Sequence, residues 1–313
     1  MTTACLDCPR GCATRGPDSY CGTSTPGRIH WRGVTLLEEH EISPTYEIYF
    51  TGCSLRCRFC TMGEAIYAPD RGEWREPQAL VASIAQPSTP PFRAISFVGG
   101  DPSVNVPYIE RLIPLLRTRF PSIQLVYNTN LYFDADRLPD VDLVVGDVHF
   151  WESDCARQVA GAKNYPEIAR KAAETLAERG VPLLLRILVL PGHVECCAVP
   201  TAAWAAGLPE SVIVSVMTNY APVGNARNHP SLGRGLNAAE MRRAGTLLPA
   251  NTRRPTTIPR PLPRPAHCID PVAPLEVDAS GRVFLPLVTG TLLPLAMQLS
   301  PALATRKVYL DAR

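Results

Sequence analysis

The stretch YEIYFTGCSLRCRFC, residues 46–60, decides the fold and most of the chemistry that the sequence predicts. Its first half is an apolar run typical of a buried strand, and its second half is a loop with three cysteines. Three residues separate Cys53 from Cys57, and two separate Cys57 from Cys60. Three thiolates at this spacing can bind three irons of a cubane cluster and leave the fourth iron open. A structural zinc site would need a fourth ligand at short spacing, and the stretch has none.

On the C-terminal side of this stretch, short apolar runs alternate with amphipathic segments. Including the run before the cysteines, the pattern predicts strands at Tyr46–Thr51, Ala94–Val98, Ile123–Asn128, Leu143–Asp147, Leu183–Leu190 and Val212–Met217. It predicts helices at Pro77–Ala85, Val106–Thr118, Tyr165–Arg179, Pro200–Ala206 and Asn237–Leu247. Such alternation is typical of parallel strands joined by crossover helices. Because six strands are too few for an eight-unit barrel, the expected fold class is α/β, a partial (β/α)6 TIM-like barrel.

The composition divides the chain into three expected regions. Residues 1–44 form a Cys-rich metal-binding extension, and residues 45–250 form the barrel. Residues 251–313 form a Pro-rich linker and a small C-terminal appendage, with two short strands around a turn at Ala279–Gly281.

Charge and hydropathy exclude some classes of partner. The 313 residues include 31 basic and 29 acidic side chains, a net charge of +2, so no nucleic-acid partner is expected. No apolar run is long enough to span a membrane, and the first residues lack the apolar core of a signal peptide. We therefore expect a cytoplasmic protein with no membrane partner.

The cysteines at the N-terminus predict a second metal site. Seven of the 11 cysteines lie in the first 60 residues, a clustering that favours metal binding over disulfides. Four thiolates can close a site around a [4Fe-4S] cluster or a zinc ion, and spacing does not separate the two. A metal-free tail is the alternative. The candidate ligands are Cys5, Cys8, Cys12 and Cys21.

The cysteine loop, with the aromatic Phe59 before its last cysteine, resembles that of the radical S-adenosylmethionine (SAM) superfamily. The resemblance implies a [4Fe-4S] cluster on Cys53, Cys57 and Cys60, with SAM chelated at the open iron and Phe59 beside the cofactor. It also implies reductive cleavage of SAM to a 5′-deoxyadenosyl radical that abstracts hydrogen from a substrate. A flavodoxin- or ferredoxin-type electron donor would be the partner.

The turn Gly99-Gly100-Asp101-Pro102 follows the second predicted strand. Two glycines let the backbone approach a ligand closely, and carbonyls with a carboxylate can accept hydrogen bonds from an ammonium group. The turn is similar to the Gly-Gly-Glu-Pro element with which the superfamily holds the methionine amino group, although Asp101 is one methylene shorter than Glu. Gly99, Gly100 and Asp101 are therefore expected to bind the cofactor.

Polar residues at the ends of later strands, or within one, are further cofactor-binding candidates. Asn128 ends the third strand, Asp147 and His149 end the fourth, and Arg186 interrupts the apolar run of the fifth. A buried arginine must be paired, either with a ligand carboxylate or with a neighbouring acid. Because active sites of barrels lie at the carboxyl ends of the strands, a role in binding competes with a purely structural one.

From Cys5 to about Leu248 the chain resembles uncharacterised relatives of the pyruvate formate-lyase activating enzyme. The resemblance runs through CLDCPRGC, EEHEISPTYEIYFTGC, VYNTNLY, LVLPGH and SVMTNYAP. Activating enzymes usually carry Asp-x-Lys where this chain has Asp147-Val148-His149, and the relatives tend to have Gln-Tyr at Asn219-Tyr220. These departures leave open whether the substrate is a glycyl-radical enzyme. His193 and Tyr220 are candidates for the catalytic site, and structural roles are the alternative for both.

The remaining cysteines are harder to interpret. Cys196 and Cys197 could bind metal or offer a thiol to a radical, but adjacent cysteines are more often small buried residues. Cys155 and Cys268 have no partner at short spacing and are interpreted as structural. The leading prediction is a radical SAM enzyme acting on a protein, a peptide or a small molecule. The alternative is a non-catalytic iron–sulfur protein that transfers electrons.

Overall fold

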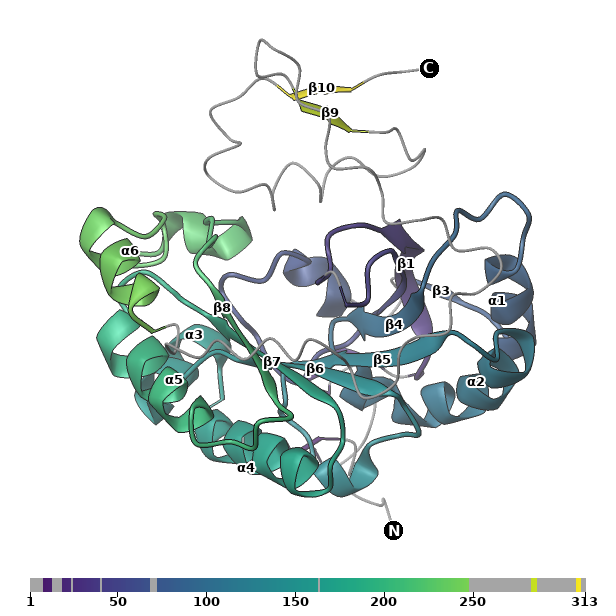
Figure 1. The fold of residues 1–313 in the computed structure, drawn as a ribbon, viewed down its shortest axis with the longest axis horizontal. Coiled ribbons are helices and arrows are strands. Elements are labelled where there is room, and N and C mark those ends of the chain that lie inside the picture. Colours follow the sequence, from purple (N-terminus) through teal and green to yellow (C-terminus); the bar gives the residue numbers. More distant parts are fainter. Residues whose placement is uncertain are drawn as a thin grey trace.

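A computed structural model describes residues 8–12, 19–23, 25–39, 41–67, 72–162 and 164–247, and the backbone of two short strands beyond them. Cys5, Cys268 and most of region 251–313 lie outside these residues. The part of the chain that is described forms an open sheet of eight strands in the order β3-β1-β2-β4-β5-β6-β7-β8. The six strands from β2 to β8 are parallel, which confirms the partial barrel of six strands (Figure 1).

The parallel strands begin and end close to where the apolar runs predict. They are β2 (Thr45–Phe50), β4 (Ala94–Gly99), β5 (Gln124–Thr129), β6 (Leu143–Val148), β7 (Leu183–Leu188) and β8 (Ile213–Met217). Five helices also match the predicted patterns: α1 (Pro77–Ile84), α2 (Val106–Arg119), α4 (Tyr165–Glu178), α5 (Val199–Ala205) and α6 (Ala238–Gly245). In Figure 1 the helices α1, α2, α4 and α5 cover the outer face of the sheet.

Several elements are additional to the sequence-based expectation. Strand β1 (Arg28–Thr35) pairs antiparallel with β2, and β3 (Glu73–Trp74) pairs antiparallel with β1. Helix α3 (Ser153–Ala160) follows β6 directly. Short 3-10 turns occur at Gly63–Tyr67, Pro102–Asn105, Ala135–Arg137 and Gly224–Asn228, and a π-helix at Val194–Ala198 follows β7.

The structure describes one strand of the expected C-terminal hairpin. Strand β9 (Val283–Leu285) pairs with β10 (Val308–Leu310), and the two run parallel. More than 20 residues separate the two strands in the sequence, in keeping with the longer connection that a parallel pair needs. The segment predicted to pair with it, before Ala279, lies outside the described residues.

The two faces of the barrel sheet bury different side chains. Alternate residues such as Ile48, Phe97 and Tyr127 belong to the large core between sheet and helices. The other face encloses a small apolar layer of Ile42, Ala94, Val126, Leu143, Val145, Leu184 and Ile213. Because side chains alternate along a strand, the next inward positions toward the carboxyl ends are Glu47, Ser96, Asn128, Asp147, Arg186 and Ser215. A polar layer therefore lies between the apolar floor and the cysteine loop.

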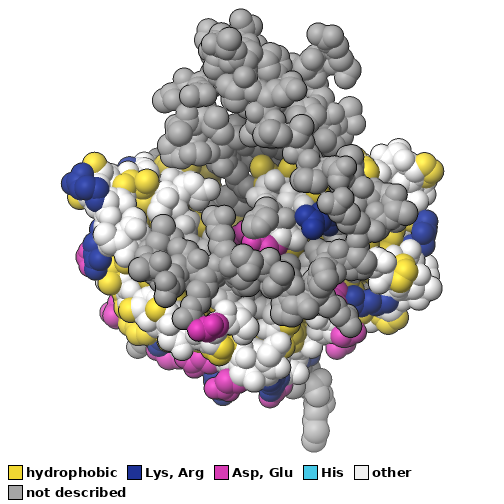
Figure 2. Space-filling model, in the orientation of Figure 1, with side chains coloured by type: hydrophobic (Ala, Val, Ile, Leu, Met, Phe, Trp, Pro, Cys, Tyr) yellow, Lys and Arg dark blue, Asp and Glu magenta, His cyan; other side chains and the backbone are white. Residues whose placement is uncertain are grey.

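The surface carries charges of both signs. Among the described residues visible in Figure 2, Lys and Arg side chains are interspersed with Asp and Glu around the rim, as the near balance of charges leads us to expect. No helix among the described residues combines the length and the apolar character that crossing a bilayer requires.

Candidate active site

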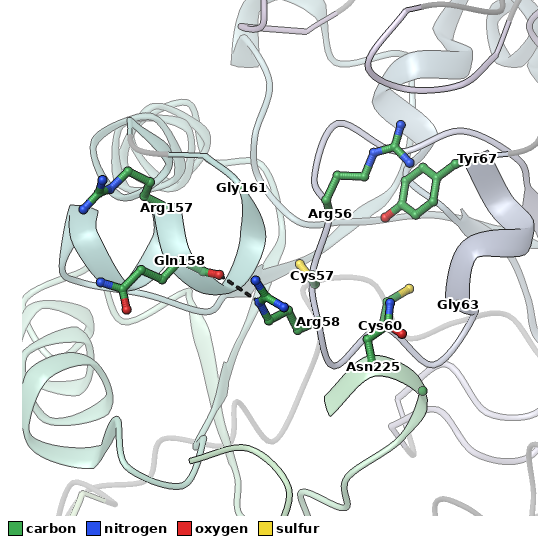
Figure 3. Close-up of a pocket in the computed structure, with 11 residues that line it drawn as sticks. Arg56, Cys57, Arg58, Cys60, Gly63, Tyr67, Arg157, Gln158, Gly161 and Asn225 are labelled. Carbon is green, nitrogen blue, oxygen red and sulfur yellow. Dashed lines mark hydrogen bonds between the residues drawn. The ribbon is translucent and has the colours of Figure 1, made fainter. Parts of the chain in front are cut away.

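The cysteine loop lies at the carboxyl end of β2, and α3 holds it from the opposite side. The N–H groups of Arg56 and Arg58 donate to the carbonyl oxygens of Ala160 and Val159, each at 2.9 Å. The Arg58 side chain adds a bond of 3.1 Å to the carbonyl of Gln158 (Figure 3). Cys57 lies between the two arginines, so the position of its thiol depends on α3.

The three thiols lie in a buried environment with hydrogen-bond donors. Leu55 N–H and the side-chain amide of Asn130 donate to the Cys53 sulfur at 3.4 and 3.7 Å. The N–H groups of Met62 and Gly63 are donors to the Cys60 thiol. Burial raises the pKa of each thiol, while these N–H groups favour the thiolate. N–H donors to cysteine sulfur are a usual feature of iron–sulfur sites.

The sulfurs of Cys53, Cys57 and Cys60 are spread more widely than the ligand atoms around a single ion. A tetrahedral zinc ion with Zn–S bonds of about 2.3 Å brings its thiolates to about 3.8 Å from one another. Of the residues that the structure describes, Cys53, Cys57 and Cys60 are not among those whose ligand atoms all lie within 4.8 Å of one another. A cubane binds each thiolate through a different iron, so its thiolates are farther apart. The residues therefore fit the predicted [4Fe-4S] cluster.

A cavity of about 810 Å³ opens beside Cys57 and Cys60, a size within the range of small-molecule sites (Figure 3). Three guanidinium groups, those of Arg56, Arg58 and Arg157, lie around it. Arg56 stacks on the ring of Tyr67 at 3.7 Å, and the Tyr67 hydroxyl donates to Leu55 O at 2.7 Å. The cavity thus adjoins the cysteine loop and has a cationic rim.

The glycine turn after β4 passes very close to the loop after β2. A Cβ on Gly100 would lie 1.9 Å from the carbonyl oxygen of Gly52, and Gly99 has a φ of +114°. The N–H of Gly100 donates to Phe50 O and that of Asp101 to Gly52 O, each at 2.9 Å. Both glycines are therefore required by the packing of this turn against the start of the cysteine loop.

The carboxylate of Asp101 is occupied by bonds within the chain. It accepts from the N–H groups of Ser103 at 2.9 Å and Asn130 at 2.8 Å, and from the Thr129 hydroxyl at 3.2 Å. Burial raises the pKa of Asp101, and these donors oppose the rise. Asp101 thus joins the end of β4 to the end of β5, and its contact with a cofactor stays a prediction.

Three of the predicted site residues meet in one aromatic group. The ring of Phe59 packs edge-on against His149 at 5.3 Å and against Tyr220 at 6.5 Å. Burial lowers the pKa of His149 to about 4, so the ring is neutral at pH 7. Its Nδ1 is buried and has no hydrogen-bond partner among the described residues. The Tyr220 hydroxyl donates to Leu232 O at 2.8 Å, so its catalytic role stays a prediction.

Arg186 is paired with acids of this chain. Its guanidinium forms ion pairs with Glu38 and Glu39, and its Nε lies 2.7 Å from Glu39 Oε1. Glu47 lies in the same layer, and burial followed by hydrogen bonding to Glu38 raises its pKa well above the usual value. Of the two partners expected for a buried Arg186, a ligand carboxylate or a neighbouring acid, the structure shows neighbouring acids. Asn128, 8% exposed, lies in the polar layer with Arg186 and Asp147.

The N-terminal segment contacts this site. Arg10 donates to Ser54 O at 2.9 Å and to Gly161 O at 2.7 Å, and it stacks on Tyr20 at 3.7 Å. The Cys21 carbonyl accepts the N–H of Cys53 at 3.2 Å. Among described residues, Cys8, Cys12 and Cys21 do not form a group with ligand atoms within 4.8 Å, and Cys5 lies outside them. The metal site predicted for these four cysteines stays a prediction.

The sequence analysis did not predict several residues that contact the site. Arg10 lies within the quoted CLDCPRGC, and Asn130 within VYNTNLY, but no rule of spacing assigns either one to the cysteine loop. Glu38 and Glu39 begin the quoted EEHEISPTYEIYFTGC, but their pairing with Arg186 could not be predicted, because Arg186 is 147 residues away from Glu39. His193 lies beside Cys155, Cys196 and Cys197, so Cys155 has metal-binding side chains as neighbours rather than a purely structural setting.

Asp147 leads to a prediction about pH. Burial raises its pKa to about 7, partly opposed by Arg186, above the value of about 3.9 for an exposed aspartate. The folded chain therefore binds this proton more tightly than the unfolded chain, and stability falls as the pH rises from about 4 to 7. We expect Asp147→Asn to be more stable than wild type at pH 8, with the difference shrinking toward pH 5. Urea midpoints at the two pH values test this, and an equal difference at both would contradict it.

The chain is similar to known proteins in sequence and in structure. The model of the radical SAM superfamily matches residues 48–205. The uncharacterised protein MJ0674 of Methanocaldococcus jannaschii is 26% identical over 219 residues, 67% of this chain and 63% of that protein. Streptococcus suis SuiB bound to SAM has a TM-score of 0.46 and 16% identity, covering 64% of this chain and 46% of that chain. A domain of a pyruvate-formate lyase-activating enzyme from Bacteroides vulgatus has a TM-score of 0.38 and 20% identity, covering 50% and 92%. The chain thus spans less than two thirds of the length of MJ0674 and of SuiB.

Proposed function

The chain belongs to the radical SAM superfamily, and from this premise we propose that it is an enzyme that cleaves SAM reductively and abstracts hydrogen from a substrate. The observation that carries the proposal is the loop of Cys53, Cys57 and Cys60 beside a cavity at the carboxyl edge of a parallel partial barrel. These three thiolates would hold the [4Fe-4S] cluster. When bound, the cluster supplies the electron and the open iron with which SAM is split to methionine and a 5′-deoxyadenosyl radical.

The chain's own residues would bind and orient the nucleotide. The strand end at Gly99 and Gly100 offers backbone carbonyls for the amino group, within a turn already fixed against Gly52. Neutral His149, with its buried Nδ1, offers a hydrogen bond beside Phe59. Asn128, Asp147 and Arg186 form the polar layer under this site, and Arg186 acts there by balancing the charge of Glu38 and Glu39.

The cationic rim of the cavity favours particular binding partners. Arg56 and Arg58, which donate to the backbone carbonyls of Tyr20 and Gln158, favour an anionic group, such as a carboxylate of a ligand or an acidic patch on a protein, whereas Arg157 is already paired with Asp154. Flavodoxins and ferredoxins present acidic surfaces, so an electron donor of that type fits this rim. The substrate is proposed only as a protein, a peptide or a small molecule, with His193 and Tyr220 as candidate contacts.

Anaerobic reconstitution of the full chain with iron and sulfide tests the proposal. After reduction with dithionite, we expect SAM to change the electron paramagnetic resonance spectrum of the cluster, and chromatography to detect 5′-deoxyadenosine. A non-catalytic electron-transfer protein would bind and reduce its cluster, yet its spectrum would be unchanged by SAM and no nucleoside would form. That result would replace the proposal with the alternative.

A further inference from the structure

Four potential metal ligands meet at a second place in the fold. The ligand atoms of Cys155, His193, Cys196 and Cys197 all lie within 4.8 Å of one another. The sulfurs of Cys155 and Cys196 are 3.8 Å apart, and the Cys196 sulfur is 3.7 Å from His193 Nδ1. No other set of His, Cys, Asp and Glu side chains among the described residues converges in this way.

These separations match those around one tetrahedral ion. Zinc bound at about 2.3 Å to sulfur and about 2.0–2.1 Å to nitrogen brings its ligand atoms to about 3.5–3.8 Å from one another. A disulfide between Cys155 and Cys196 would need its sulfurs at about 2.05 Å. We propose that Cys155, His193, Cys196 and Cys197 bind a single metal ion of the zinc class in a closed Cys3His site.

The fold explains why the four residues converge. Cys155 is in the first turn of α3, after β6, whereas the other three are in or next to the π-helix after β7. Strands β6 and β7 are neighbours in the sheet, so the segments after them leave the same edge side by side. One turn of the π-helix brings Cys196 and Cys197 back to His193, whose carbonyl accepts the Cys197 N–H at 3.0 Å. Short π-helices occur often at functional sites.

The surroundings support a bound ion. The N–H groups of Trp151 and Glu152 hydrogen-bond the Cys197 sulfur, as outer-shell donors do in structural zinc sites. Cys197 is buried, whereas Cys155, His193 and Cys196 are partly exposed, so an ion has a route of entry. Helix α6 holds the same loop, through Glu240 bonded to Gly192 N–H at 2.8 Å and Arg243 paired with Glu195.

The Cys3His site includes a residue of the same helix, α3, that holds the cysteine loop. Its ligand Cys155 lies near the start of α3, and the end of α3 holds Arg56 and Arg58 on either side of Cys57. Phe150 is 6.3 Å from the ring of His193 and 6.3 Å from that of Phe59. Four protein ligands leave no open position, so the ion would be structural and would fix α3 against the π-helix.

Metal analysis of the full-length chain tests this inference, with protein produced in zinc-supplemented medium and purified without chelator. Mass spectrometry of wild type should find a zinc content that falls by about one equivalent per chain in Cys155→Ser and in Cys197→Ser. Cys57→Ala, as a matched control, should keep that zinc while losing cluster iron. Cys8→Ser should also keep it, because the N-terminal cysteines are a separate candidate site.

A measurement on wild type makes the test independent of folding in the variants. Zinc-edge X-ray absorption should show about three sulfur ligands at about 2.3 Å and one nitrogen at about 2.0–2.1 Å. Wild type without zinc, zinc unchanged in Cys155→Ser and Cys197→Ser, or iron with sulfide at these residues would each overturn the inference. Because SAM cleavage is assayed separately, failure here is distinguishable from failure of the proposed function.

Discussion

Cys57→Ala should reduce 5′-deoxyadenosine formation by more than about 100-fold. Changing a residue that only hydrogen-bonds a metal ligand typically costs about 10- to 100-fold, and removing a ligand itself should cost more. Cys57 is one of three thiolates proposed to hold the cluster, and its loop offers no substitute ligand at short spacing. Iron after anaerobic reconstitution should fall together with activity. Iron and sulfide analysis, with chromatography of the nucleoside products, gives both readouts.

Two further variants control this experiment. Cys268→Ala removes a cysteine that is not part of any site proposed above, and it should keep both iron and activity. Asn130→Ala removes the donor 3.7 Å from the Cys53 sulfur and should cause an intermediate loss, about 10- to 100-fold. If Cys57→Ala retained a full cluster and SAM cleavage, the assignment of this loop as the cluster site would be wrong.

Arg186→Met should lower the free energy of unfolding by about 3–5 kcal/mol, the cost of removing one partner from a buried ion pair. The side chains of Arg186 and Glu38 are 11% and 10% exposed, so water cannot replace the lost cation. Glu39 loses the same partner. Urea denaturation of wild type and variant at pH 7.5 measures the difference.

The loss of stability caused by Arg186→Met should depend on pH. Without Arg186, the buried carboxyls take up protons more readily, and protonation removes the unpaired charge. The loss of stability should therefore be smaller at pH 5.5 than at pH 8. Arg111→Met is the matched control, because Arg111 and Glu76 form an ion pair in which each side chain is 58% exposed. It should cost less than about 1 kcal/mol. Equal effects of the two variants would contradict the role assigned to Arg186.

Much of the barrel could be predicted because its strands are buried on both faces. Runs such as Leu183–Leu188 are apolar at nearly every position, and the helices between them have a clear apolar face. Helix α3 was not predicted, because its eight residues make only about two turns, which is shorter than the stretch over which an amphipathic pattern is recognised, although Ala156, Val159 and Ala160 share its buried face. Strand β1 was not predicted either, because most of its side chains are only half-buried and its pattern does not alternate cleanly.

The sequence alone determined that Cys53, Cys57 and Cys60 lie close together, because residues within a stretch of eight are brought together by the loop itself. Only the tertiary structure decided what lies around them. Cys155 meets Cys196 across 41 residues, because the segments after the neighbouring strands β6 and β7 leave the same edge of the sheet. Arg186 on β7 meets Glu39 across 147 residues, although three strands separate β7 from β2, because the curved sheet brings both side chains into one interior layer. A pattern of residues along the chain predicts each strand, but the register between strands determines which buried charges and thiols become neighbours.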